Sequence, residues 1–352
     1  MPASTNPENG KPAPHVAAAD EPAPGERREL AGAREETRKP RGTPRIDPWR
    51  VGALVVVGVV VVVALLRFSG GREALDALLR VPLGTVLLML GILYTAMTVR
   101  AWRWQVLLEA VGYRVGLGSL WSLLLTGYFL NTVVPARAGD LARIFLLGRW
   151  HKVPFETATG ALVMERAIDV VVILVGAAGA AYVVLPALVP PAVAQGYLVA
   201  MLIMLALFAA LLVAPRLEGW LLGLWSNRRY QAVMRLGFNF LGAIRRMAAD
   251  WRRLLLALAH TVFIWGAEVA VASLAMGALG IHLPLGQMTF CILSQVEAVY
   301  LSLLMLLQAP RESAGVAILL NRTVSFWSIM LVGGVTTLIS GSLKRAEEAP
   351  SS

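Results

Sequence analysis

From Val51 onward, the sequence alternates between long apolar blocks and short basic loops, and this pattern constrains the fold more than any other feature. A helix needs about 20 apolar residues to cross a bilayer. The composition agrees, because only 15% of the residues are charged, whereas soluble domains carry roughly 25%. We therefore predict an all-α polytopic membrane protein. The predicted full spans are 51–66, 81–99, 157–185, 193–214, 254–280 and 314–341.

The two ends of the chain have a different composition. Residues 1–48 hold nine of the 19 prolines, mix acids with bases and show no apolar periodicity. Such a segment cannot bury enough apolar surface to fold, so we predict disorder. The predicted organisation is a disordered cytoplasmic tail over 1–48, a transmembrane domain over 49–343 and a short cytoplasmic tail over 344–352.

The net charge of +10 raises the question of nucleic-acid binding. The basic residues, however, lie in short loops between apolar blocks, where the cytoplasmic face of a membrane protein carries them. We therefore expect a membrane and anionic lipid as partners, and no nucleic acid. Cys291 is the only cysteine and the four histidines have no metal-ligand spacing, so we expect no metal site.

Two further apolar stretches, 119–150 and 287–308, do not fit as simple spans. Residues 131–140 interrupt the first and include Pro135 and Gly139, which both weaken a helix. Such a break inside a bilayer is tolerated only where protein or a wet cavity covers it. We therefore expect irregular backbone at a protected site.

Charge in the loops predicts the topology. Segment 215–253 holds eight arginines against two acids and is predicted to be cytoplasmic, whereas 186–196 is uncharged and predicted to be outside. Residues 100–118 and 151–156 are then both inside. Because both of its flanks are cytoplasmic, 119–150 is predicted to be a re-entrant hairpin.

The same reasoning applies to the second stretch. Residues 281–286 are uncharged and Lys344-Arg345 is basic, so span 314–341 runs inward and 287–308 enters and leaves from outside. The result is six spans, two re-entrant hairpins and both termini in the cytoplasm. This topology leaves four arginines outside: Arg67, Arg72, Arg80 and Arg311.

Residues 228–253 are predicted to be an interfacial helix and not a span. Apolar residues recur at helical spacing between arginines, which is typical of an amphipathic helix on the cytoplasmic surface. A solvated connector is the alternative.

Charged residues inside the spans need partners, because a lone charge at the bilayer centre costs about 2.5–3.5 kcal/mol. Glu165 and Asp169 are four residues apart on one helical face, and Arg166 is three residues before Asp169. Acid–arginine spacing also repeats. Asp140 precedes Arg166 by 26 residues and Glu297 precedes Arg322 by 25. An acid in a hairpin followed by an arginine in the next helix, in opposite orientations, indicates an inverted repeat. Structural pairing of broken helices is one alternative interpretation, and chance agreement of the spacing at two positions is another.

The residues Arg100-Ala-Trp-Arg103-Trp104 are predicted to end the second span. An interfacial anchor of Trp and Arg is one interpretation. A phosphate contact is the other, because a guanidinium fork suits phosphate geometry.

Four groups of residues carry a family resemblance: Arg100-x-x-Arg103-Trp104, Asn131-x-x-x-Pro135-x-Arg137-x-Gly139-Asp140-x-x-Arg143, Glu165-Arg166-x-x-Asp169, and Glu297 with Arg322. With this combination, roughly residues 52–341 resemble the membrane region of lysylphosphatidylglycerol synthases, a flippase-like family. The resemblance implies a lipid-translocating bundle with re-entrant helices. It implies substrates such as aminoacylated phosphatidylglycerol, polyprenyl-phosphate sugars or hopanoids.

The chain departs from that family at two places. The full synthase carries an aminoacyl-transferase domain after its membrane region, and this sequence stops at Ser352, so we expect no such domain and no lipid synthesis. The family's Pro-Gly-Gly-x-Gly loop is replaced by residues 290–296 before Glu297. Loss of those glycines favours a stiffer, more helical second hairpin.

The predicted function is movement of an anionic phospholipid or lipid-linked polar headgroup across the cytoplasmic membrane of a bacterium or archaeon. Arginines attract the headgroup, and the acids hold the arginines, with one acid as candidate carrier of a coupling proton. No Gly-x-x-x-x-Gly-Lys-Ser/Thr loop occurs, so we expect neither direct ATP drive nor a cofactor. The alternatives are a non-transporting partner of an envelope enzyme in trans, or an enzyme that modifies a lipid headgroup, with acid–base candidates in Asp140, Glu165 and Asp169. A homo-oligomer is compatible with either function. The predicted site residues are Arg100, Arg103, Asn131, Arg137, Asp140, Arg143, Glu165, Arg166, Asp169, Glu297 and Arg322.

Overall fold

The structure is a computed structural model. It describes residues 72–133, 138–184, 228–293 and 311–348, with isolated residues at 195–196, 199, 202–203 and 206. All regular structure in these residues is helical, as predicted. The elements are α3 (Arg72–Leu79), α4 (Leu83–Glu109), α5 (Leu117–Val133), α6 (Ala138–His151), α7 (Phe155–Val184), α10 (Arg228–Ala249), α11 (Trp251–Gly277), α12 (Leu285–Leu293), α14 (Arg311–Arg322), the π-helical turn η2 (Thr323–Trp327) and α15 (Ser328–Glu348).

Three described helical runs are long and apolar enough to cross a membrane: α4, α11 and the run over Gly315–Ile339 that joins α14, η2 and α15. They correspond to the predicted spans 81–99, 254–280 and 314–341. Helix α7, which ends at Val184, covers the predicted span 157–185 except for its last residue, which lies outside the described residues. The predicted span 51–66, and all but isolated positions of 193–214, lie outside the described residues.

Helix α4 does not end near Arg100, where the second span was predicted to end. It continues to Glu109, and Arg103 and Trp104 are buried in the protein, with 1% and 0% of their surface exposed. The cause is tertiary, because carboxylates on α7 pair with Arg103 and remove the need for it to reach the interface. The interfacial-anchor interpretation of this segment therefore fails for Arg103.

Helices α5 and α6 form the first hairpin, which the sequence predicted over 119–150. Their backbones approach so closely that a Cβ on Gly139 would lie 1.9 Å from the carbonyl oxygen of Gly127. Only glycine at 139 permits this contact. The side-chain oxygen of Asn131 accepts a hydrogen bond from the backbone N–H of Asp140 at 3.2 Å, which ties the end of α5 to the start of α6.

The described part of the second hairpin is α12, which packs against α7. A Cβ on Gly176 of α7 would lie 2.8 Å from the side chain of Leu293, so the two helices are in close contact. Glu297 and the rest of the predicted hairpin lie outside the described residues, and the inverted repeat stays a prediction.

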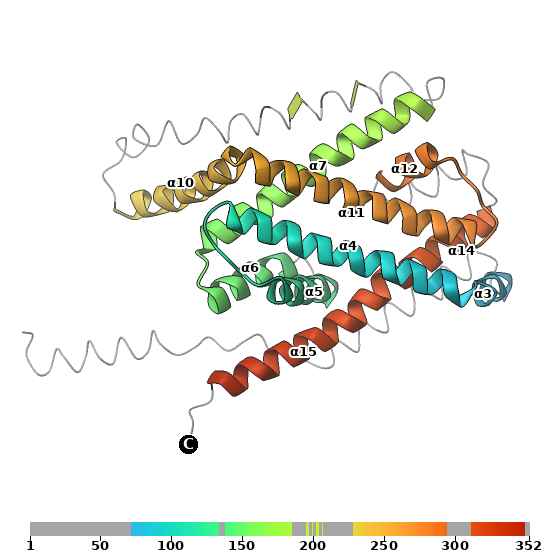
Figure 1. Ribbon diagram of the computed structural model, residues 1–352, viewed down its shortest axis with the longest axis horizontal. Coiled ribbons are helices and arrows are strands. Elements are labelled where there is room, and N and C mark those ends of the chain that lie inside the picture. The colour runs from blue at the N-terminus through green and yellow to red at the C-terminus, as the bar shows by residue number, and fades with distance from the viewer. Residues whose placement is uncertain are drawn as a thin grey trace, which may run out of the picture. The chain divides into compact units, whose positions relative to one another are not determined.

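Figure 1 shows α4 and α11 lying side by side, and the contact between them is the most extensive of any pair of described helices. Helix α5 packs against α6 on one side and α15 on another, and α10 packs on α7. An amphipathic helix was predicted over 228–253, and the structure has α10 over Arg228–Ala249, while residues 251–253 begin α11. In α10, Ala243, Ile244 and Met247 are buried, while Arg245 and Arg246 are exposed.

Helix α11 begins at an Asp cap. The side chain of Asp250 accepts a hydrogen bond from the backbone N–H of Arg253 at 3.1 Å, and it also pairs with the Arg253 guanidinium. That backbone hydrogen bond, supported by the guanidinium, holds the pKa of Asp250 below its usual value. The cap separates α10 from α11 and so sets where the amphipathic helix ends and the span begins.

Candidate functional site

A cluster of buried ion pairs joins α4, α6 and α7. Arg103 of α4 pairs with two carboxylates of α7. Its Nη1 lies 2.5 Å from Asp169 Oδ1, and its Nη2 lies 3.2 Å from Glu165 Oε1. Arg103 also donates to the Thr261 hydroxyl of α11 at 2.7 Å. Because charges in a low-dielectric interior are costly unless paired and hydrogen-bonded, these contacts explain how α4 tolerates an arginine inside a span.

Arg143 on α6 extends this cluster. Its Nη2 lies 3.5 Å from Glu165 Oε2 and its Nε 3.6 Å from Asp140 Oδ1. The guanidinium also lies over the Trp104 ring, 5.1 Å from the ring centroid, which is a cation–π contact. Arg143 thereby links α6, the second helix of the first hairpin, to the buried face of α7.

Arg166 is the exposed arginine of the cluster. Its side chain is 42% exposed, and its nearest carboxylate oxygens, on Asp169 and Asp140, lie at 3.6 and 3.7 Å. A third, on Glu165, lies at 4.0 Å. These distances hold the charge in place but exceed hydrogen-bonding length. With respect to the described carboxylates, the guanidinium therefore keeps donors available for a ligand.

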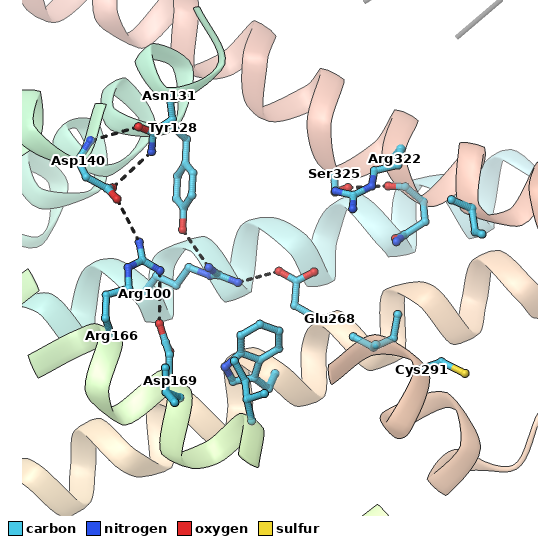
Figure 2. Close-up of a pocket in the computed structure, with 16 residues that line it drawn as sticks. Arg100, Tyr128, Asn131, Asp140, Arg166, Asp169, Glu268, Cys291, Arg322 and Ser325 are labelled. Carbon is cyan, nitrogen blue, oxygen red and sulfur yellow. Dashed lines mark hydrogen bonds and ion pairs between the residues drawn. The ribbon is translucent and has the colours of Figure 1, made fainter. Parts of the chain in front are cut away.

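A cavity of about 670 Å³ lies on the exposed side of this cluster. Figure 2 shows Arg166, Asp169 and Asp140 along one side of it, and Arg322 and Ser325 on another. The further lining residues come from α4, α5, α7, α11, α12 and α14: Arg100, Tyr128, Asn131, Val170, Ile173, Trp265, Glu268, Cys291, Ile292, Ile318 and Asn321.

Arg100 bridges three helices at this cavity. It donates to the Tyr128 hydroxyl of α5 at 2.9 Å and to Glu268 Oε1 of α11 at 2.7 Å. Its side chain is 13% exposed, and that of Glu268 is 26% exposed. Both charges therefore face the cavity while they pair with each other.

A π-helical turn lies on the opposite side of the cavity. Asn321 and Arg322 end α14 and line the cavity, and Ser325 lies within the turn η2. The Ser325 hydroxyl donates to the Asn321 carbonyl at 2.7 Å. Such turns are frequent at functional sites because they widen the helix and re-aim its side chains.

The structure brings together every predicted site residue that it describes. Six line the cavity: Arg100, Asn131, Asp140, Arg166, Asp169 and Arg322. Three lie in the ion-pair cluster behind it: Arg103, Arg143 and Glu165. Arg137 and Glu297 lie outside the described residues. The predicted contact of Asp140 with Arg166 is present at 3.7 Å.

Sequence reasoning missed Glu268, Tyr128 and Trp265 as site residues. Glu268 had a usable signal, because it is the only charged residue between Arg253 and Glu297 and so required a partner. Tyr128 and Trp265 had none, since aromatic residues in apolar helices are usually core.

Counting the described site residues gives five arginines, at 100, 103, 143, 166 and 322, against four carboxylates, at 140, 165, 169 and 268. The difference, five minus four, is one net positive charge. Among the described residues, no group of His, Cys, Asp and Glu side chains is arranged to hold a metal ion. The site is therefore suited to hold an anion through guanidinium groups.

Comparison with known proteins identifies the family. The family described as the lysylphosphatidylglycerol synthase TM region matches residues 51–296. The chain belongs to this family. Its members here include a UPF0104 membrane protein of Methanothermobacter thermautotrophicus, 24% identical over 66% of this chain and 74% of the relative. Another, from Pyrococcus horikoshii, is 22% identical over 81% of this chain and 96% of the relative.

A third UPF0104 membrane protein, from Methanocaldococcus jannaschii, is 23% identical over 34% of this chain and 37% of the relative. No solved structure matches the chain. Membership of this family and the apolar helices make the chain a membrane protein. The sequence-based resemblance is thereby confirmed.

Proposed function

We propose that this protein moves an anionic phospholipid, or a lipid-linked anionic headgroup, across the cell membrane through the cavity between α4, α7 and α14. The observation that carries the proposal is the environment of Arg166, whose guanidinium lines a cavity in a membrane protein. The carboxylate oxygen nearest to this guanidinium, on Asp169, is 3.6 Å away. A phosphate oxygen accepts from such a group at shorter distance and in a bidentate geometry.

The buried cluster behind Arg166 supports this role. Asp140, Glu165 and Asp169 each lie near Arg166 and also near a second arginine, either Arg103 or Arg143. The carboxylates therefore hold Arg166 in position and stay paired when it contacts a ligand. Pre-organised charge of this kind binds without the cost of rearrangement.

The size of the cavity fits a headgroup. About 670 Å³ lies within the range of roughly 300–1,000 Å³ that small-molecule sites occupy. Two long acyl chains would not fit together with the headgroup, so we expect the chains to stay in lipid. The cavity then protects only the polar part, which is the part that costs free energy to move through hydrocarbon.

The proposed mechanism is alternating exposure of the cavity to the two sides of the membrane. The helical hairpin α5–α6 and the segment around α12 are the proposed re-entrant elements, and we propose that they are related as an inverted repeat. The proposal places a multi-pass protein in the cell membrane, with lipid as its substrate and no chemical change to the headgroup.

Lipid movement in liposomes tests the proposal. Purified protein is reconstituted with fluorescent phosphatidylglycerol, and the probe that becomes accessible to an impermeant quencher is followed with time. Wild type should exchange the probe faster than protein-free liposomes. Arg166→Gln should be about tenfold or more slower, because losing a hydrogen bond to a charged group costs about 1.5–3 kcal/mol.

The matched control is Arg245→Gln, which removes an exposed arginine from α10, away from the cavity. It should exchange lipid like wild type. Wild-type protein no faster than empty liposomes, or Arg166→Gln as fast as wild type in a folded state, contradicts the proposal. Thermal unfolding of each variant before reconstitution establishes that it is folded.

A further inference from the structure

Glu268 has a different environment from the other carboxylates of the site. Its Oε1 accepts a hydrogen bond from Arg100 Nη2 at 2.7 Å, and Arg100 is its only charged partner among the described residues. Figure 2 shows the second oxygen of this carboxylate without any interaction to the residues drawn. Glu268 therefore depends on one arginine for the stability of its charge.

The remaining three carboxylates each have several partners. Asp140 pairs with Arg143 and Arg166, and Asp169 pairs with Arg103 and Arg166. Glu165 lies near Arg103, Arg143 and Arg166. A headgroup that contacts Arg166 consequently leaves all three paired. A headgroup that takes the Arg100 Nη2 donor competes with Glu268 for its single charged partner among the described residues.

We infer that binding of an anionic headgroup at Arg100 is coupled to uptake of one proton by Glu268. This inference rests on the proposed function. The proton comes from water in the cavity and binds a carboxylate oxygen of Glu268, which becomes a neutral acid. It returns to water when the anion leaves and Arg100 pairs with Glu268 again. The coupling carrier is thus a residue outside the family motifs.

Loss of the Arg100 pair favours this exchange. The one net positive charge of the described site already balances one singly charged headgroup, so the need for a proton lies at Glu268 itself, which is left without its cation. A carboxylate in a low-dielectric region that loses its cation is costly and takes up a proton instead. Arginine cannot supply the compensation, since it stays protonated.

The other titratable and charged groups around Glu268 come from the neighbouring helices that line the cavity. Helix α10 also packs against α11 but contributes none of the described cavity lining. The groups that share the cavity with Glu268 are Arg100 of α4, Tyr128 of α5, Asp140 of α6, Arg166 and Asp169 of α7, Cys291 of α12 and Arg322 of α14.

This coupling has a defined sign. If binding takes up a proton, lower pH strengthens anion binding and higher pH weakens it, by up to about tenfold per pH unit for one linked proton. A proton gradient across the membrane then biases on which side the headgroup binds. The protein gains an energy source that needs no nucleotide.

Calorimetry of the full-length protein in detergent tests the inference. The probe is dihexanoyl phosphatidylglycerol, whose phosphodiester does not titrate between about pH 5 and about pH 8. Titrations in buffers of different ionisation enthalpy count the protons taken up per bound probe. Wild type should take up about one, and Glu268→Gln should take up none and bind with an affinity independent of pH.

Two variants serve as controls. Glu109→Gln removes the carboxylate that ends α4, outside the cavity, and should take up protons like wild type. Glu268→Asp keeps a titratable group and should retain uptake. Wild type that binds the probe without proton uptake overturns the inference, whether or not the variants fold. Uptake retained in Glu268→Gln also overturns it, as does the absence of binding to wild type.

The liposome assay separates this inference from the proposed function. Wild type that moves phosphatidylglycerol but takes up no proton on binding leaves the proposed function standing and rejects only the coupling. Wild type that binds the probe with proton uptake but does not move lipid retains the coupling and rejects lipid transport.

Discussion

Arg103 shows what a charge needs in order to lie inside a membrane helix. Its guanidinium reaches Asp169, Glu165 and Thr261 from α4, and only 1% of its side chain is exposed. Each partner supplies an oxygen acceptor, so the charge is neutralised and its Nη donors are hydrogen-bonded. The cost of burial is offset by geometry at this residue, and not by access to water.

Replacing Arg103 with Gln should destabilise the protein by about 3–5 kcal/mol, because Asp169 and Glu165 lose a buried partner. Arg103→Lys should be intermediate, since it keeps the charge but lacks the planar fork. Thermal unfolding in detergent, followed by tryptophan fluorescence, measures the change.

The control for this series is Arg114→Gln, at an exposed position between α4 and α5. It should stay within about 0.5 kcal/mol of wild type, as exposed substitutions usually do. An Arg103→Gln protein that unfolds at the wild-type temperature contradicts the importance of the cluster.

The limit of sequence reasoning is visible at these same residues. The acid–arginine contact within α7 follows from sequence separation along one helix, and the contact of Asp140 with Arg166 was predicted from the repeated acid–arginine spacing. The partners of Arg103 follow from neither pattern, because Asp169 lies 66 residues away on another helix. Local hydropathy therefore treated Arg100 and Arg103 as the end of a span, when tertiary pairing lets α4 continue to Glu109.

At the scale of elements, α5 is held by close backbone contacts on two sides. Gly139 of α6 approaches the Gly127 carbonyl on one side. On the other, a Cβ on Gly333 of α15 would lie 2.7 Å from the Leu125 carbonyl oxygen. Small residues such as glycine commonly allow helix backbones to approach closely in membrane proteins. The hairpin is consequently a packed unit and not a pair of independent helices.

Gly139→Ala should disrupt this hairpin. The new Cβ would meet the Gly127 carbonyl oxygen at 1.9 Å and the Asn131 backbone nitrogen at 2.6 Å, and neither backbone group can rotate away. We expect a loss of about 1–3 kcal/mol or more, together with loss of lipid movement, because Asp140 follows directly. Thermal unfolding and the liposome assay measure the two effects.

Gly91→Ala is the matched control, since Gly91 lies within α4 with no atom within 4 Å of the added Cβ. It should be neutral or slightly stabilising. A Gly139→Ala protein as stable and active as Gly91→Ala would show that the α5–α6 contact is not needed.

The sequence predicted where this hairpin occurs but not how it is closed. Pro135 and the loop charges indicated a break with both flanks on one side, and the structure has α5 and α6 on either side of residues 134–137. The Gly127–Gly139 contact depends on the rotation of one helix against the other, which no local pattern reports. The π-helical turn η2 was unpredicted for the same reason.

At the scale of the molecule, one hydrophobic cluster joins segments that are distant in sequence. Val115 after α4, Val153 before α7, and Ala243 and Met247 of α10 pack together with the first turns of α11. These segments are therefore grouped at one end of the described helices. Loop charge predicts the same grouping, since 100–118, 151–156 and 215–253 are each assigned to the cytoplasm from their own arginines. The grouping is shared by the two properties, and the cytoplasmic assignment stays a prediction.

The opposite end of α11 belongs to another packed group. Leu274 and Ala278 pack against the same hydrophobic cluster as Leu78 and Val81, which lie before α4, so the start of α4 and the end of α11 lie at one end of the described helices. The antiparallel packing of α4 and α11 follows from this arrangement (Figure 1). It places the loop over residues 278–284 opposite to α10.

Cysteine labelling tests this arrangement in intact cells. In a Cys291→Ser background, single cysteines are placed at Arg114, Lys152 and Arg245 on one end and at Asp76 and His282 on the other, all of them exposed positions. An impermeant reagent should label positions 76 and 282 in intact cells, and the other three only after permeabilisation. The experiment tests the orientation in the membrane and the packing of the helices separately. If all five sites label in the reverse pattern, the packing is right and the assignment from loop charge is wrong. If positions 114, 152 and 245 differ among themselves, the packing of α4, α7 and α10 into one end is wrong, because no orientation of a single bundle produces that result.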